Sequence, residues 1–413
     1  MLEFTRLGVR LPNVLLSDTD RSTLLSELTV SPIKSDYEFM EQSYKVYTSS
    51  TNNIYVPRFF FSYISKNPSE YKSAPQQVTN NLPTGDRVKL VFKGVLNTST
   101  EQPQAATAVT NELRSKQGCI LCLPTGFGKT TVALHVLASL GVKTLIVVHK
   151  EFLMNQWIEK IAHFLPDARV GRIQGPVIEV DNKDIVVGML QSLSMKTYER
   201  GLFESFGLTI IDETHHVCTK TFSKIFTKFN SRYVLGLSAT LHRTDGLTHV
   251  LHWFLGNIGY YTKRVNQSNV RVKLIPYTPS VSFPLTNTKK PNMSAAVTLL
   301  TEDDKRNDII LEAIRDCISS TDRRLIILTD RREHCVHLVT KCKEMYGETS
   351  SGLFIGGMKP DEYRTNETRQ IIVGTYSLAH EGLDIPALDT IILATPKSNI
   401  VQAVGRILRE TTG

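Results

Sequence analysis

One loop restricts the fold of this chain more than any other feature: residues 123–131, with the sequence LPTGFGKTT. An apolar run at 119–123 leads into the loop, and a segment with apolar residues at helical spacing, TVALHVLASL, follows it. Apolar runs without alternation are typical of strands that are covered on both faces. The order strand, glycine loop, helix therefore predicts a parallel sheet flanked by helices.

The loop also has the chemistry of a phosphate-binding site. Gly126 and Gly128 let the backbone curl so that successive N–H groups can face an anion. Lys129 adds a positive charge, and Thr130 offers a hydroxyl ligand to Mg²⁺. The complete motif has glycine where this chain has Leu123, so the loop deviates from the motif at one position. The residues expected to bind the nucleotide are Pro124, Thr125, Gly126, Phe127, Gly128, Lys129, Thr130 and Thr131.

Two adjacent carboxylates, Asp212 and Glu213, follow another apolar run at 208–211. At the end of a buried strand, the first carboxylate can hold Mg²⁺ and the second can orient or deprotonate an attacking water. Asp-Glu pairs also occur on solvated loops, but this pair shares its chain with a phosphate loop. The pair is therefore predicted to complete a site that hydrolyses a nucleoside triphosphate, with Thr130 and Asp212 as metal ligands.

Apolar runs alternate with longer amphipathic segments from residue 118 onward, in two series. The runs lie at 119–123, 144–149, 185–189, 208–211 and 233–237, and then at 325–328, 353–355, 370–373 and 390–393. Each series is typical of a doubly wound α/β domain. The expected organisation is an N-terminal accessory domain at 1–96, a first α/β domain at 97–280, a linker at 281–299 and a second α/β domain at 300–413.

The first 96 residues carry no nucleotide-binding signature and are expected to form a small α+β domain. They contain short segments that favour strands, at 53–56 and 87–92, separated by Ser, Asn, Pro and Gly. Residues 55–66, YVPRFFFSYISK, combine aromatic and basic side chains. Such a segment suits either the packing of a small core or the stacking of nucleic-acid bases, which would make this domain DNA-binding.

Net charge is concentrated in one part of the chain. The formal charge is +8, and the window 214–280 alone has nine basic residues against one acid, Asp245. Such an excess suits nucleic acid as a partner. No apolar run approaches the length of a membrane span, and six scattered cysteines suit a reducing compartment. We therefore expect neither a membrane partner nor secretion. The expected location is a cytoplasmic, nuclear or viral DNA compartment.

The motifs, in this order, resemble the superfamily 2 helicases and translocases over residues 100–409. The matching segments are LPTGFGKT (motif I), DETH (motif II), GLSAT (motif III), GTYSLAHEGLDIP (motif V) and QAVGRILR (motif VI). Within the superfamily, the chain is most similar to the XPB and UvsW group and to helicases of phages and large DNA viruses. XPB-type proteins carry Arg-Glu-Asp where this chain has Arg243, Thr244 and Asp245, so the middle acid is missing.

The resemblance implies two tandem RecA-like domains that bind ATP with Mg²⁺. By matching position, Gln402, Arg406 and Arg409 would act on the ATP from the second domain, where the arginines stabilise charge on the γ-phosphate. The alternative for QAVGRILR is an amphipathic helix with solvated arginines. Asp384 would lie near the ribose or link the domains. Gln104 resembles the glutamine that reads adenine in many relatives, although Gln102 is an alternative in the same segment.

Further residues are expected to couple the nucleotide to a nucleic-acid strand. Ser238 and Thr240 would bond the motif II backbone or His215, unless they only cap a turn. The residues expected to contact nucleic acid are Gln191, Ser192, Arg243, Lys263, Arg264, Gly374 and Thr375. Contacts to the phosphate backbone make binding largely independent of sequence. The lysines at 220, 224 and 228 are expected to form a solvated helix face, with DNA contact as the alternative.

The expected function is an ATP-dependent DNA helicase or translocase, a monomer acting on duplex, forked or branched DNA. RNA remains an alternative partner, as in an ATPase that releases transcripts. A scaffold without catalysis is disfavoured by the complete set of Lys129, Asp212, Glu213 and the two arginines. The chain ends four residues after Arg409, where RecA-like domains usually continue, so a truncated second domain is expected.

Overall fold

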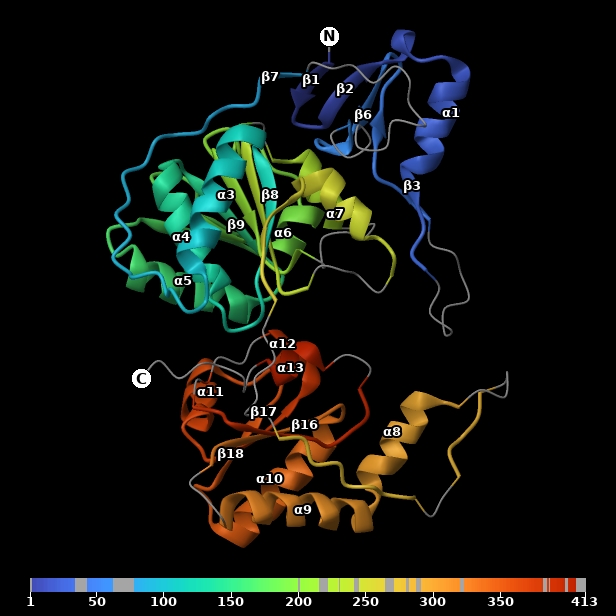
Figure 1. Ribbon diagram of the computed structural model, residues 1–413, viewed down its shortest axis with the longest axis vertical. Helices are drawn as coiled ribbons and strands as arrows, with labels where there is room; N and C mark the ends of the chain where they lie inside the picture. The colour runs from blue at the N-terminus through green and yellow to red at the C-terminus, as the bar shows by residue number, and fades with distance from the viewer. Residues whose placement is uncertain are drawn as a thin grey trace. The chain divides into compact units, whose positions relative to one another are not determined.

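The computed structural model divides the chain into two units, residues 1–264 and 265–413. Each unit is described separately below (Figure 1). The residues that the structure describes are 2–33, 43–61, 78–199, 201–214, 222–229, 231–240, 245–263, 271–279, 282–286, 291–319, 323–381, 385, 387–397 and 400–405.

The first unit is built on an eight-stranded sheet among the described residues, in the order β11-β10-β12-β9-β13-β14-β8-β15. All neighbouring strands are parallel except β10 and β11. The strands are β8 (Gly118–Cys122), β9 (Thr144–Val148), β10 (Val170–Gln174), β11 (Val177–Ile178), β12 (Ile185–Met189), β13 (Leu208–Ile211), β14 (Tyr233–Ser238) and β15 (Ile258–Tyr261). The helices are α3 (Gln102–Lys116), α4 (Lys129–Leu140), α5 (Glu151–Phe164), α6 (Leu190–Met195), the 3₁₀ helix η3 (Phe222–Thr227) and α7 (Thr248–Leu255).

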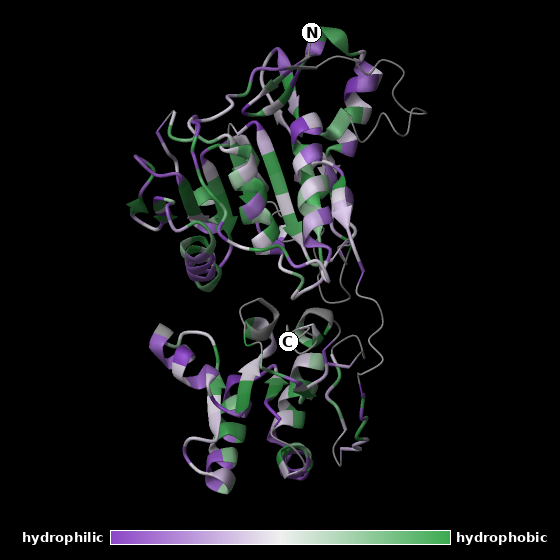
Figure 2. Ribbon diagram, turned by 60° about the vertical axis from the view of Figure 1, so that its left-hand side comes forward, coloured by the Kyte–Doolittle hydropathy of each residue, from purple (hydrophilic) through white to green (hydrophobic). Residues whose placement is uncertain are grey.

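Helices cover both faces of this sheet, which explains its continuous apolar strands. Side chains alternate between the faces, so Leu145 and Val147 of β9 join one hydrophobic cluster, whereas Ile146 and Val148 join the other. The cluster with Ile146 includes α3, α4 and α5, and the opposite cluster includes α6 and α7. Figure 2 shows the hydrophobic residues concentrated along the central strands. The α/β parallel-sheet fold predicted from the sequence is confirmed.

The N-terminal residues form a small α+β layer that packs against the first sheet. Its strands pair in the order β5-β6-β2-β1-β7, with a separate pair β3-β4. The elements are β1 (Leu2–Thr5), β2 (Gly8–Pro12), η1 (Asn13–Leu15), α1 (Asp18–Glu27), β3 (Thr29–Val30), β4 (Tyr44–Lys45), β5 (Thr48–Ser49), β6 (Asn53–Val56) and β7 (Val78–Asn80). Phe60 is fully buried and packs edge-on against Trp253 of α7, with ring centroids 5.1 Å apart. At Phe60 the aromatic segment therefore packs a core.

The second unit contains a four-stranded parallel sheet among its described residues, in the order β17-β18-β16-β19. The strands are β16 (Leu325–Thr329), β17 (Ser351–Phe354), β18 (Ile371–Thr375) and β19 (Thr390–Leu393). The helices are α8 (Met293–Glu302), α9 (Asp304–Ser319), α10 (Arg332–Tyr346), α11 (Pro360–Glu367), α12 (Tyr376–Glu381) and α13 (Val401–Val404). Clusters on both faces again fill the space under the helices.

Three local predictions differ from the structure. Residues 87–92 form no strand, because their segment bonds to the ends of helices: the N–H of Val88 donates to the carbonyl of Gly141, 3.0 Å away. Residues 293–299 of the predicted linker belong to α8, whose first turn is capped by the side chain of Asn292. The lysine-bearing segment contains the 3₁₀ helix η3 in place of an α-helix. No helix in the described parts of the chain is long and apolar enough to cross a membrane.

Candidate active site

The glycine loop connects β8 to α4 at the carboxyl edge of the first sheet. Gly126 and Gly128 have φ angles of 89° and 79°, in the left-handed region that glycine adopts without strain. The N–H of Phe127 donates to the carbonyl of Pro124 over 3.2 Å, which closes the turn. Lys129 is the first residue of α4, so the helix begins where a phosphate would lie and its unpaired N–H groups face that position.

Gln102 forms a hydrogen bond that supports this loop, a role that the sequence did not reveal. Its side chain is buried, and Nε2 donates to the carbonyl of Phe127 over 3.0 Å. A Cβ atom at Gly128 would lie 2.4 Å from that nitrogen, so a side chain there would displace the amide of Gln102, and the positive φ of 79° would strain it as well. Gln104, the residue matched to adenine recognition, is exposed in the first turn of α3. The structure thus brings the alternative glutamine, Gln102, to the loop.

The two carboxylates follow β13, and β14 lies between β13 and the strand that leads into the loop. Backbone pairing fixes Asp212, whose N–H donates to the carbonyl of Val147 over 3.0 Å. The N–H of Glu213 donates to Oδ1 of Asp212, 3.0 Å away. Glu213 has a φ of 46°, a left-handed conformation that is uncommon for a residue with a side chain and is found at functional sites.

Trp157 holds the other oxygen of Asp212. Its Nε1–H on α5 donates to Oδ2 of Asp212 over 2.8 Å. Burial raises the pKa of Asp212, and the negative charge of Glu213 raises it further. The hydrogen bond from Trp157 and the positive charge of Lys129 act in the opposite direction. Nζ of Lys129 donates to the carbonyl of Leu123 over 3.2 Å. Two carboxylates that repel each other beside a lysine and a helix N-terminus are a donor set that suits a divalent cation and a phosphate.

Trp157→Phe is expected to weaken ATP hydrolysis most at acidic pH. Loss of the indole N–H removes a hydrogen bond to a charged group, worth roughly 1.5–3 kcal/mol, and raises the pKa of Asp212 further. A metal ligand must be ionised, so the acidic limb of the rate profile should move to higher pH and the rate below it should fall about 10-fold. Steady-state ATPase profiles measure this, with Trp253→Phe as the control. An unchanged acidic limb would remove Trp157 from the site.

Ser238 and Thr240 lie at the end of β14, beside the carboxylates. Oγ of Ser238 donates to the carbonyl of Thr240 over 2.7 Å, and the N–H of Thr240 donates back to Oγ over 3.2 Å. These two bonds close a turn, which matches the alternative role of capping. His215 lies outside the described residues. The coupling role of these three residues stays a prediction.

The residues matched to nucleic-acid contact in the first unit also follow strand ends. Gln191 is the second residue of α6, directly after β12, and its Nε2 donates to the carbonyl of His149 over 2.8 Å. Oγ of Ser192 accepts the N–H of Gly175 over 3.0 Å. Lys263 is exposed beyond β15. Arg243 and Arg264 lie outside the described residues.

Lys228, expected on a solvated face, has a structural role. Its Nζ donates to the carbonyls of Leu193, Ser194 and Lys196, at 2.7, 2.9 and 2.5 Å. These contacts fasten η3 to the end of α6. Lys224 is exposed, and Lys220 lies outside the described residues.

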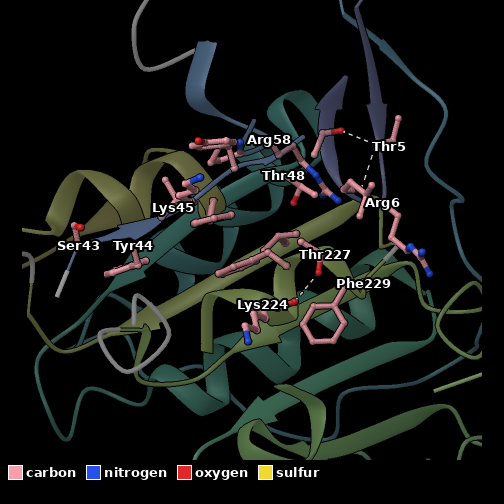
Figure 3. A pocket seen from close by; sticks show the side chains of 18 residues that line it. Thr5, Arg6, Ser43, Tyr44, Lys45, Thr48, Arg58, Lys224, Thr227 and Phe229 are labelled. Atoms are coloured by element: carbon pink, nitrogen blue, oxygen red, sulfur yellow. Dashed lines mark hydrogen bonds between the residues drawn. The ribbon is translucent and has the colours of Figure 1, made fainter. Parts of the chain in front are cut away.

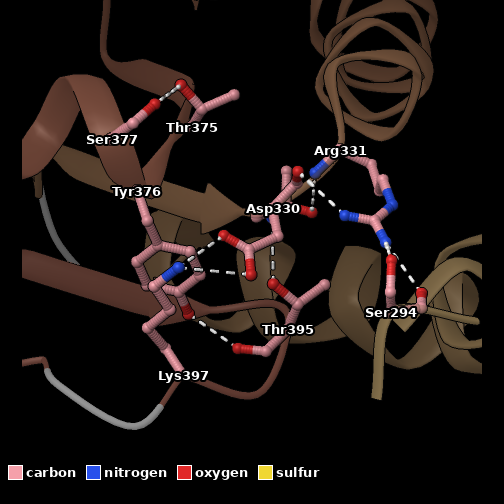
Figure 4. A network of polar contacts seen from close by, with 9 residues as sticks. Ser294, Asp330, Arg331, Thr375, Tyr376, Ser377, Thr395 and Lys397 are labelled. Atoms are coloured by element: carbon pink, nitrogen blue, oxygen red, sulfur yellow. Dashed lines mark hydrogen bonds and ion pairs between the residues drawn. The ribbon is translucent and has the colours of Figure 1, made fainter. Parts of the chain in front are cut away.

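In the second unit, Gly374 and Thr375 end β18 at the carboxyl edge of its sheet. A polar network occupies the same edge (Figure 4). Nζ of Lys397 pairs with Oδ1 of Asp330 at 3.0 Å, and the hydroxyl of Tyr376 donates to the carbonyl of Thr395 over 2.7 Å.

The other residues matched to the second domain of the motor are Gln402, Asp384, Arg406 and Arg409. Gln402 is the second residue of α13. Asp384, Arg406 and Arg409 lie outside the described residues, so their roles stay predictions.

Comparison with known proteins places these motifs among nucleic-acid motors. Residues 96–243 match the family described as the res subunit of type III restriction enzymes. A protein of Acanthamoeba polyphaga mimivirus, provisionally named an ATP-dependent RNA helicase, is 31% identical over 99% of this chain and 79% of its own length. The protein XPB2 of Sulfurisphaera tokodaii, named a DNA 3'-5' translocase, is 35% identical over 58% of this chain and 49% of its own.

The fold is also found among solved structures. A fragment assigned as the HsdR subunit of a type I restriction enzyme from Vibrio vulnificus aligns with a TM-score of 0.51 and 20% identity. The alignment covers 74% of this chain and 59% of that one.

Proposed function

The chain belongs to the superfamily 2 helicases, in the XPB/UvsW-like group, and is an ATP-hydrolysing enzyme that acts on nucleic acid, and we propose that the nucleic acid along which it moves, its track, is DNA. Hydrolysis would drive movement along duplex, forked or branched DNA and the separation or migration of its strands. The observation that carries this proposal is the 35% identity to a protein named a DNA translocase. The basic window 214–280, with its single acid, supports a surface that holds duplex phosphates.

The chain's own residues account for the chemical step in this proposal. The N–H groups at the start of α4 and the charge of Lys129 would hold the β- and γ-phosphates. Thr130 and Asp212 would hold Mg²⁺, which, when bound, neutralises charge on the phosphates. Glu213, fixed by its N–H bond to Asp212, would orient the attacking water and accept its proton. Gln402, Arg406 and Arg409 are proposed to stabilise charge on the γ-phosphate.

We propose that residues at the strand ends of both sheets couple ATP hydrolysis to movement along the nucleic acid. In the first unit, β14 lies between the strand that carries the carboxylates and the strand that leads into the phosphate loop. A displacement of the carboxylates or of the loop would therefore displace Ser238 and Thr240 at the end of β14. Gln191, Ser192, Gly374 and Thr375 would contact phosphates through hydroxyl, amide and backbone groups that read no bases. We therefore expect the motor to act on many DNA sequences alike, as a monomer.

RNA is the second candidate track, favoured by the 31% identity to the mimivirus protein named an RNA helicase. The two candidates differ in which polymer accelerates ATP hydrolysis. Hydrolysis should rise severalfold with single-stranded, forked or four-way DNA and little with RNA of the same length. Measurement of phosphate release with matched oligonucleotides at one salt concentration decides between them, since salt alone changes affinity strongly. Stimulation by RNA alone would overturn the DNA proposal.

A further inference from the structure

A pocket of about 480 Å³ lies where the N-terminal layer meets η3, apart from the candidate active site. Its lining comes from the turn between β1 and β2, from residues 43–48 and 57–58, from η3 with the residues that follow it, and from Val234 of β14 and Phe254 of α7. All these segments belong to the first unit. The volume lies within the usual range of small-molecule sites, and none of the lining residues belongs to the glycine loop or the carboxylate pair.

The charged side chains that line this pocket are all basic. They are Arg6, Lys45, Arg58 and Lys224, and no carboxylate occurs among its described lining residues. Arg58 is partly buried, and one of its nitrogens donates only to carbonyls, of Ser231 at 2.9 Å and Arg232 at 3.2 Å. Burial lowers the pKa of Arg58 to about 10. A partly buried cation that has no carboxylate partner among the described residues is unfavourable, and a bound anion would compensate it.

Aromatic rings line the same pocket. Phe226 of η3 and Phe254 of α7 stack with centroids 4.2 Å apart and planes 8° from parallel. Tyr47 carries Nζ of Lys45 over its ring, 5.6 Å from the centroid. Figure 3 shows Lys45 and Arg58 on one side of the pocket and Lys224 and Phe229 on the other. The combination of rings and cations suits a ligand that has both a flat π-system and a phosphate.

We propose that this pocket binds one nucleotide unit, with its base on the aromatic rings and its phosphate on the basic side chains. The unit can belong to an unpaired strand or be a free nucleotide, because both present the same chemistry. Its occupant would contact η3, which is the next described element after Asp212 and Glu213 along the chain. The proposal does not depend on whether the track is DNA or RNA.

The test uses 2-aminopurine, a fluorescent base that stacking quenches. One arm is a single-stranded oligonucleotide with one 2-aminopurine, and the other is free 2-aminopurine ribonucleoside monophosphate. Lys45→Glu and Arg6→Glu, both at exposed positions, are expected to weaken the quenched complex about 10-fold or more. Each should also lower the slope of log affinity against log salt by about 0.7, the contribution of one phosphate contact on a single strand.

The matched control is Arg21→Glu, which makes the same charge change at an exposed position of α1 outside the pocket. Circular dichroism and the thermal midpoint establish that each variant is folded. Quenching of the oligonucleotide alone, lost in Lys45→Glu and Arg6→Glu, supports the pocket with a strand as the source. Quenching of the free monophosphate with the same loss supports it with a free nucleotide. Equal quenching in these variants and in the control overturns the proposal, whatever polymer stimulates ATP hydrolysis.

Discussion

Lys129→Ala is expected to abolish ATP hydrolysis, lowering the steady-state rate at least about 100-fold. The lysine is the charged group at the start of α4, and its Nζ already lies beside the loop, 3.2 Å from the carbonyl of Leu123. Alanine keeps the helix and removes only the charge that faces the phosphates. Phosphate release at saturating nucleic acid measures the rate, and nucleotide titration measures the accompanying loss of ATP affinity.

Lys116→Ala is the matched control for this result. That lysine is exposed on α3 and, among the described residues, forms an ion pair with Glu112 alone, at 2.9 Å, so its loss should leave hydrolysis unchanged. Retained hydrolysis in Lys129→Ala would mean that the loop does not bind the triphosphate as proposed.

Glu213→Gln is expected to stop turnover while ATP still binds. Glutamine has the same shape but cannot accept a proton, so the attacking water loses its base and the rate falls about 10²–10⁴-fold. The substitution should keep the backbone bond to Asp212 and the left-handed conformation at this position. Single-turnover hydrolysis, together with ATP binding by equilibrium titration, separates the two effects.

The control is Glu204→Gln. Glu204 is exposed in the segment before β13, and the substitution makes the same chemical change at a residue with no assigned role in the site. If Glu213→Gln lost ATP binding to the same degree as turnover, Glu213 would serve the nucleotide complex and not the water. If turnover and ATP binding in Glu213→Gln both stayed at the level of Glu204→Gln, another group would be the base.

The elements that carry the motifs could be predicted because burial leaves a direct mark on sequence. The runs at 144–148 and 208–211 lack alternation, since helices cover both faces of their sheet, and each appears as a strand. The glycine loop could also be predicted, because a left-handed φ at two positions strongly favours glycine. The position of Asp212 and Glu213 could be predicted because they directly follow an apolar run, which forms β13.

The contacts that tune the site could not be predicted. Trp157 reaches Asp212 from a helix 55 residues earlier in the chain, and an apolar tryptophan at helical spacing predicts only core packing. Gln102 and Gln104 are indistinguishable by spacing, and the structure separates them by burial. The basic pocket joins residues from the first 60 positions to residues after 220, so no local pattern could indicate it. Long-range contacts of this kind depend on the packing of whole layers.

Displacement of a third DNA strand tests the central claim, that ATP hydrolysis moves this chain along DNA. A fluorescent strand bound as a triplex on a duplex leaves only when a motor passes, whether or not the duplex is opened. We expect release with ATP and Mg²⁺, none with a non-hydrolysable analogue, and none with Glu213→Gln. A third strand that stays bound while DNA-stimulated hydrolysis continues would contradict it.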